Sequence, residues 1–189
     1  MSFFVQSLFY AIPAFAFLVF VEMLAARIMG VRINRPADMI SSLSSGLTNT
    51  IQGSLKYGVV LVSYSAMLPY LTVIELKPIW LAVAIAFVVE DFAGYWMHRL
   101  NHRVNVFWNR HVIHHSSEEF NLSCALRQSI SQTFKFQAIL YIPAAVLGVP
   151  PYIFAVLGPI HLFMQFWYHT QLIGRMGILE LFLVTPSHH

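Results

Sequence analysis

The chain has 189 residues, of which 58% are hydrophobic and only 10% are charged, and its formal net charge is +3. Soluble domains have about 45–50% apolar and about 25% charged residues, so this composition excludes an ordinary soluble globule and indicates a chain partly solvated by lipid. No basic stripe interleaved with aromatic residues lies apart from the expected membrane edges. We therefore expect no nucleic-acid partner.

Three apolar stretches in the first half of the chain predict membrane-spanning helices. The first covers about residues 3–24, long enough to cross a hydrocarbon core of about 30 Å. Residues 34–56 are more polar and predict a connection that contains a short interfacial helix. The second span is expected at about 57–74 and the third at about 79–97. The turn between them, 75–78, is short, so these two helices should pack antiparallel.

The next apolar region predicts a helical hairpin. Its arms, 136–147 and 152–168, are separated by the sequence GVPP at 148–151, whose glycine and two prolines break a continuous helix. Each arm is short for a full crossing, so the hairpin either enters the bilayer and returns or crosses it twice in a tilted form. The expected fold class is all-α, an integral membrane helical bundle.

The distribution of cations predicts the orientation of this bundle. No lysine or arginine precedes residue 27, and the cations then gather after the first span and after the third. They are Arg27, Arg32, Arg35 and Lys56, then Arg99, Arg103, Arg110, Arg127 and Lys135. The positive-inside rule places the N-terminus outside and the polar segments after Met97 on the cytoplasmic face, in a bacterial inner membrane or the endoplasmic reticulum.

All nine histidines lie at or after His98, and their spacing is typical of metal ligands. His98 and His102 are four residues apart, which places both rings on one face of a helix. His111, His114 and His115 follow with spacings of three and four. The other four are His161 and His169 on the second hairpin arm, and the adjacent pair His188 and His189.

These histidines predict a metal centre built from nitrogen ligands. Clustered neutral imidazoles hold a first-row transition metal without thiolates, and more than four of them indicate two metals. The zinc-protease motif H-E-x-x-H is absent, and no set of cysteines is present for a structural zinc. A hydrogen-bonded structural role is the alternative for any single histidine.

Several polar residues could orient the ligands from behind. Asp91 lies seven residues before His98 on nearly the same helical face, and carboxylates deep in an apolar run are usually functional or paired. Glu90 lies beside it on a different face. The other candidates are Glu118, Asn121 and Gln165. The alternatives are a structural partner for Asp91, a solvated surface for Glu118 and its neighbours, and simple hairpin lining for Gln165.

Four motifs in a fixed order resemble the fatty acid hydroxylase superfamily of integral-membrane di-iron oxidoreductases, over about residues 79–189. They are DFAGYWMHRLNH at 91–102, WNRHVIHHSSEEFN at 108–121, FWYHT at 166–170 and TPSHH at 185–189. The run HHSSEEFNLSCALRQS, residues 114–129, resembles the alkylglycerol monooxygenase-like branch most. The chain is accordingly divided into N-terminal membrane helices with their connecting loop, 1–78, and a hydroxylase-type domain, 79–189.

The resemblance implies a role for most of the histidines. His98 and His102 match the first box, HxxxH, and the triple run from residue 111 matches the second, HxxHH. His169 matches the single histidine between boxes, and His189 matches the first ligand of a third HxxHH, with His188 beside it. His161 has no match. The family's third box has two further histidines, so we expect a domain that is incomplete at its C-terminus and a second metal short of ligands.

The function implied by the resemblance is O₂-dependent hydroxylation of a lipid C–H bond at two irons. The substrate would be an ether lipid or a related lipid that enters from the bilayer. The separate electron donor would be tetrahydrobiopterin or a cytochrome b5-like protein, because no nicotinamide or flavin motif is present. The alternatives are a sterol desaturase or C4-methyl oxidase activity, a non-catalytic fragment, and a haem-binding membrane electron carrier.

Overall fold

The computed structural model describes residues 3–129 and 137–189, with side chains from residue 9 onward except those of 51, 54 and 137. The regular structure in this part of the chain is entirely helical, which confirms the predicted fold class. The helices are α1 (Phe3–Met29), α2 (Pro36–Leu71), α3 (Ile79–Arg103), α4 (Asn105–His111), α5 (Gln137–Leu140), α6 (Ile142–Val146) and α7 (Pro151–Phe166). The same part of the chain has three 3-10 turns: η1 (His114–Ser116) and η2 (Cys124–Leu126) between α4 and α5, and η3 (Gly177–Leu181) after α7.

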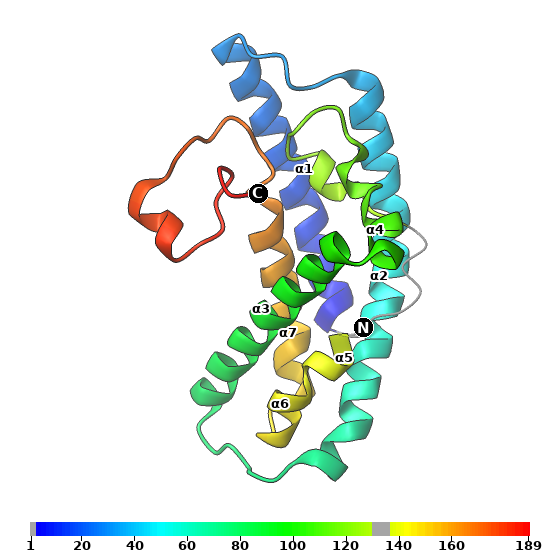
Figure 1. The fold of residues 1–189 in the computed structure, drawn as a ribbon, viewed down its shortest axis with the longest axis vertical. Coiled ribbons are helices and arrows are strands. Elements are labelled where there is room, and N and C mark those ends of the chain that lie inside the picture. Colours follow the sequence, from blue (N-terminus) through cyan, green and yellow to red (C-terminus); the bar gives the residue numbers. More distant parts are fainter. Residues whose placement is uncertain (1–2, 130–136) are drawn as a thin grey trace.

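Helix α2 corrects the prediction of a polar connection over 34–56. It begins at Pro36, a residue suited to the first helical position, and runs unbroken to Leu71 along the whole length of the molecule (Figure 1). Two of its exposed hydroxyl groups have partners within the helix: Ser44 Oγ donates to the Ile40 carbonyl at 2.6 Å, and Thr48 Oγ1 donates to the Ser44 carbonyl at 3.0 Å. The helix ends before the expected limit of the second span, and the connection to α3 covers 72–78.

Within the described residues, two helices are long and apolar enough to cross a membrane: Phe9–Met29 within α1, and α3. Only 22% and 28% of the residues in their most apolar windows are buried inside the molecule, so most of their apolar side chains face outward. Such surfaces are unfavourable in water and favourable in lipid, which supports association with a membrane. Helix α2, where the second span was expected, is not one of the two.

The main core forms where α2, α3, α6 and α7 meet. Ala82, Ala86 and Ala93 lie on one face of α3 and are buried, and such small side chains let neighbouring helices approach closely. Across from them, two tyrosines one heptad apart on α2 hold the hairpin. Tyr57 donates to the Phe154 carbonyl at 2.6 Å, and Tyr64 donates to the Val149 carbonyl at 2.7 Å.

The helical hairpin is confirmed, with a broken first arm. That arm consists of the short helices α5 and α6, and its expected start at residue 136 lies outside the described residues. Gly148 takes a φ of +66° and turns the chain, while Pro151 starts α7. A side chain at Gly148 would also collide with the Ile74 carbonyl, 2.5 Å from an ideal Cβ. The turn therefore requires glycine for two independent reasons.

Helix α1 packs against the other end of α7. The Phe15 ring lies 4.5 Å from the Phe166 ring, and Phe166 is buried. Glu22, also buried, accepts a hydrogen bond from the Leu122 backbone N–H at 2.7 Å. The ring contact fixes the end of α7, just before the segment that carries His169, and the Glu22 hydrogen bond joins α1 to the segment after the second histidine box.

Candidate metal centre

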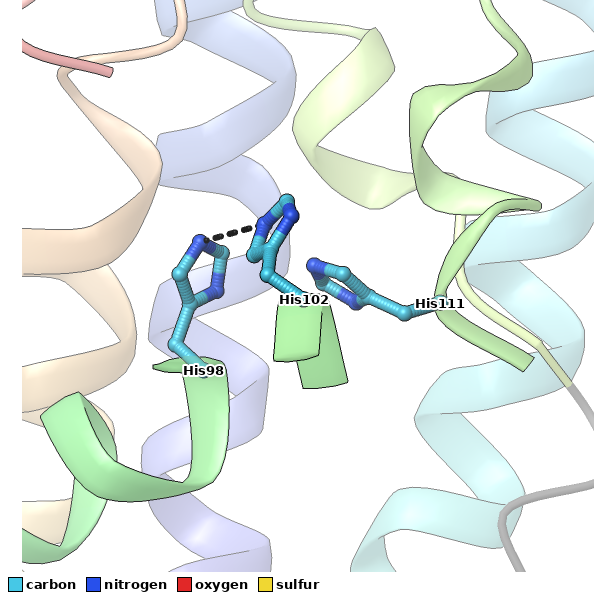
Figure 2. Close-up of side chains that lie close together, drawn as sticks. All are labelled: His98, His102 and His111. Carbon is cyan, nitrogen blue, oxygen red and sulfur yellow. Dashed lines mark hydrogen bonds between the residues drawn. The ribbon is translucent and has the colours of Figure 1, made fainter. Parts of the chain in front are cut away.

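The first histidine group is formed by the end of α3 and by α4. His98 and His102 lie on the last turns of α3 with their Nε2 atoms 3.1 Å apart. Val104 is extended and ends α3, so α4 folds back and directs His111 toward the same point (Figure 2). The ligand atoms of these three histidines all lie within 4.8 Å of one another.

The second group brings together three histidines from distant parts of the chain. His114 lies in η1, His169 follows the end of α7, and His189 lies in the C-terminal turn. The His114 and His169 Nε2 atoms are 3.2 Å apart, and the three ligand atoms again lie within 4.8 Å. The C-terminal loop swings out from α7 and returns, so that the His189 ring lies 5.6 Å from the His98 ring (Figure 1).

His115 lies between the two groups. Its Nε2 is 3.2 Å from that of His111, and its ring is 4.7 Å from the His102 ring. On the other side, its ring is 5.0 Å from the His114 ring. The two groups are therefore neighbours in one cluster of seven imidazoles.

The spacing and charge state of these rings fit a transition metal. Two nitrogens that bind the same metal ion, each at about 2.0–2.1 Å from it, lie about 3 Å from one another. This separation matches the three short distances between Nε2 atoms. Burial, followed by repulsion from neighbouring histidines, lowers the pKa of His111 to about 3 and that of His115 to about 4. The same causes, in the same order, lower the pKa of His169 to about 2 and that of His189 to about 3. These rings are neutral at physiological pH, as ligands must be.

Aromatic rings enclose the cluster on two sides. Trp108 stacks on His115 with ring centroids 5.7 Å apart. Tyr168 lies 4.7 Å from the His189 ring, and Phe120 lies 6.0 Å from it. These side chains cover part of the cluster, while His102 and His115 are exposed.

The second group opens into a pocket of about 200 Å³. Besides histidines, its walls include Phe120 and Cys124, and its other polar lining comes from Ser117, Glu118 and Glu119. Burial raises the pKa of the Cys124 thiol to about 11, and Cys124 belongs to neither group of candidate ligands. The donor set is therefore nitrogen-based, with room for a small part of another molecule beside it.

The backbone fixes the orientation of His114. Its Nδ1 lies 3.0 Å from the carbonyl oxygen of Arg127. A carbonyl can only accept, so Nδ1 carries the proton and Nε2, the atom that faces His169, has its lone pair free. Metal-binding histidines commonly use their second nitrogen in this way.

Two predicted ligands lie outside the cluster of seven. His188 is exposed and belongs to neither group. His161 is buried in the middle of α7, where its ring lies 4.6 Å from Phe87. The structure thus brings together seven of the nine candidate histidines.

Among the four predicted supporting residues, Gln165 affects a ligand through its backbone, which opposes the lowering of the His169 pKa. Asp91 is exposed on α3, and its charge acts on His161 and Tyr168. Gln165 is exposed beside Gly94, with its Nε2 3.4 Å from the place a Cβ would take there.

The other two supporting candidates hold the loop that follows the second box. Glu118 forms an ion pair with Arg35. Asn121 is buried, donates to the Ile33 carbonyl and accepts the Cys124 backbone N–H at 3.1 Å. Glu118 and Asn121 therefore join this loop to the connection between α1 and α2.

Sequence reasoning missed Arg127, Trp108, Phe120 and Tyr168. For two of them a signal was present, because Tyr168 directly precedes His169, and Trp108 lies three residues before His111 on one helix face. The role of Arg127 depends on its backbone carbonyl, and a residue's type carries no information about that.

The sequence is similar to those of known lipid-modifying enzymes, and a family model matches the part of the chain that contains the histidine cluster. A family model described as fatty acid hydroxylase matches residues 83–189. Alkylglycerol monooxygenase of Danio rerio is 41% identical over 84% of the chain, and that of Homo sapiens is 39% identical over 95%. An ornithine lipid hydroxylase of Rhizobium tropici is 30% identical over 59% of the chain.

The chain spans only 35% and 40% of the length of the two alkylglycerol monooxygenases, and 34% of the length of the ornithine lipid hydroxylase. No solved structure gives a significant match. The family match covers more than half of the chain and includes all nine histidines. The chain therefore belongs to the fatty acid hydroxylase family, in its alkylglycerol monooxygenase-like branch.

Proposed function

We propose that this protein is a membrane oxidoreductase that uses O₂ to hydroxylate a C–H bond of an ether lipid or a related lipid. The observation that carries the proposal is the pair of adjacent, all-histidine groups that opens into a pocket. Two irons would be held there, one by His98, His102 and His111, and the other by His114, His169 and His189. His115, whose Nε2 lies 3.2 Å from that of His111, would be a further ligand. When bound, the irons would supply the activation of O₂.

The protein's own residues would position the metals and limit water. Burial keeps His111, His114 and His169 neutral and oriented before metal binds, so little reorganisation is needed. The rings of Trp108 and Tyr168 cover the flanks of the cluster, which protects a reactive centre from side reactions.

The reaction needs an electron donor and a lipid. Hydroxylation consumes O₂, two electrons and two protons, and it yields the alcohol and one water molecule. Tetrahydrobiopterin or a cytochrome b5-like protein would supply the electrons. On an ether lipid, a hydroxyl placed beside the ether oxygen gives a hemiacetal, which breaks into a fatty aldehyde and a free alcohol.

The products of a competition assay test this function. Membranes containing the protein are given an alkylglycerol and a sterol together, with ¹⁸O₂ and either donor. We expect a fatty aldehyde from the alkylglycerol. When this aldehyde is trapped by reduction, the fatty alcohol that forms should contain ¹⁸O. An oxidised sterol with an unchanged alkylglycerol would contradict the ether-lipid assignment, and no oxidised lipid of either kind would contradict the enzyme itself.

We also propose a multi-pass arrangement with the N-terminus outside and the histidine cluster on the cytoplasmic face. The cations that follow α1 support it, as do Arg99 and Arg103 at the end of α3. The residue Val31 is exposed between α1 and α2, whereas Cys124 is buried. A Val31→Cys variant should react with a membrane-impermeant maleimide only after the membrane is permeabilised, which gives the reagent access to the cytoplasmic side. Labelling of intact cells would refute this orientation.

A further inference from the structure

The first half of α2 carries a polar stripe that faces the segment after the second histidine box. Its members are Asp38, Ser42, Ser45 and Asn49. Spacings of four, three and four residues place these side chains on one face of a helix. The stripe is partly or fully buried, although it lies in a helix with many exposed residues.

Two members of the stripe hold the backbone of Gln128. Ser45 Oγ donates to the Gln128 carbonyl at 2.8 Å and accepts the Gln128 backbone N–H at 3.0 Å. Asn49 Nδ2 also donates to this carbonyl. The segment at 126–128 is thus bound to the helix through both its donor and its acceptor.

The other two members hold the side chain of Arg127. Its Nη2 donates to Asp38 Oδ1 at 2.7 Å and to the Asp38 carbonyl at 2.9 Å, and its Nε donates to Ser42 Oγ at 3.2 Å. Arg127 is only 6% exposed and Ser42 is fully buried. A buried guanidinium with several charge-assisted bonds has little freedom, so it fixes its own backbone as well.

A glycine allows this close approach. Gly46 lies within the stripe, and an ideal Cβ there would be 2.9 Å from Leu126 Cβ and 3.4 Å from the Leu126 carbonyl. A methyl group at this position would push the segment away from α2. Gly53, two turns later on the same helix, has no described neighbour within 4 Å of its ideal Cβ.

We propose that the polar stripe of α2 positions the metal ligand His114. The stripe holds the 126–128 segment, whose Arg127 carbonyl accepts the Nδ1–H of His114 at 3.0 Å and keeps Nε2 free for metal. The side-chain nitrogen of Gln128, at 3.4 Å from Nδ1, is the more distant neighbour. Asp38, Ser42, Ser45, Asn49 and Arg127 are then positioning residues. This inference rests on the proposed function, in which His114 binds metal.

Two matched pairs of variants of the full chain test the proposal. Ser45→Ala removes both bonds to Gln128, whereas Ser44→Ala removes only a bond of an exposed hydroxyl within α2. Gly46→Ala displaces the segment, whereas Gly53→Ala adds the same methyl group in open space. The probe is Co²⁺, whose visible absorption reports the number and geometry of its ligands, titrated into metal-free protein.

Changes in the support of a metal-binding histidine typically weaken metal affinity by about 10–100-fold. In Ser45→Ala and Gly46→Ala, we expect such a loss, with a changed spectrum, for the Co²⁺ ion that is held by the group containing His114. In Ser44→Ala and Gly53→Ala, we expect the same titration as in the wild-type protein. If Ser45→Ala and Gly46→Ala bound both ions as their controls do, the proposal would be overturned, even if these two variants unfolded at a lower temperature. A wild-type protein that binds no Co²⁺ would overturn the proposed function, and this inference with it.

Discussion

The His169→Ala variant is expected to bind one metal ion per chain instead of two and to lose all measurable lipid hydroxylation. His169 is 5% exposed, and its Nε2 lies 3.2 Å from that of His114, so its loss removes one of three nitrogens from the second group. His102→Ala should have the same effect through the first group. Metal analysis and turnover of an alkylglycerol measure both effects.

His188→Ala is the matched control for these two variants. It removes an imidazole next to a proposed ligand, but His188 is exposed and belongs to neither group. We expect two metals and wild-type turnover in this variant. Loss of a metal in His188→Ala, or two metals retained in His169→Ala, would contradict the proposed ligand sets.

The second large effect is expected from Phe154→Ala, which should lower the free energy of unfolding by about 3–5 kcal/mol. Phe154 is fully buried, its ring stacks on Tyr141 at 4.6 Å and meets Tyr64 edge-on at 5.1 Å. Its removal leaves a cavity where α2 and the hairpin meet, because the surrounding rings cannot collapse fully.

Thermal unfolding of the protein in detergent measures this loss. Tyr152→Ala is the control on the same helix, because that ring is 59% exposed. We expect the control to unfold close to the wild-type temperature. Equal destabilisation by both variants would show that the α2–α7 core does not carry the stability assigned to it.

The helical spans and the hairpin could be predicted because their signals are local. Apolar length predicts α1 and α3, and a glycine followed by two prolines breaks the hairpin at 148–151. The pairing of His98 with His102 follows from helical geometry alone. These predictions need no knowledge of what lies across from each helix.

Helix α2 could not be predicted in this way, because the partners of its polar residues are distant. Ser45 and Asn49 indicate a loop when only their neighbours are considered. In the structure their hydrogen bonds go to the backbone of Gln128, about 80 residues later in the chain. The same limit applies to the supporting residues of the metal centre: Asp91 has the right helical phase, but it is exposed.

Adjacent histidines also required the structure. His188 and His189 are indistinguishable by composition, yet the C-terminal turn directs only His189 into the second group. His161 lies eight residues before His169, within α7, where it packs against Phe87. The direction of each ring is set by the backbone around it, and spacing alone does not determine it.

The metal content of the purified protein tests the central claim most directly. Iron and other metals are measured per chain by mass spectrometry, and a visible spectrum of the same sample detects any haem. Two adjacent groups of three histidines predict two irons per chain and no Soret band. One iron, no iron or a haem spectrum would contradict a two-iron centre in this protein.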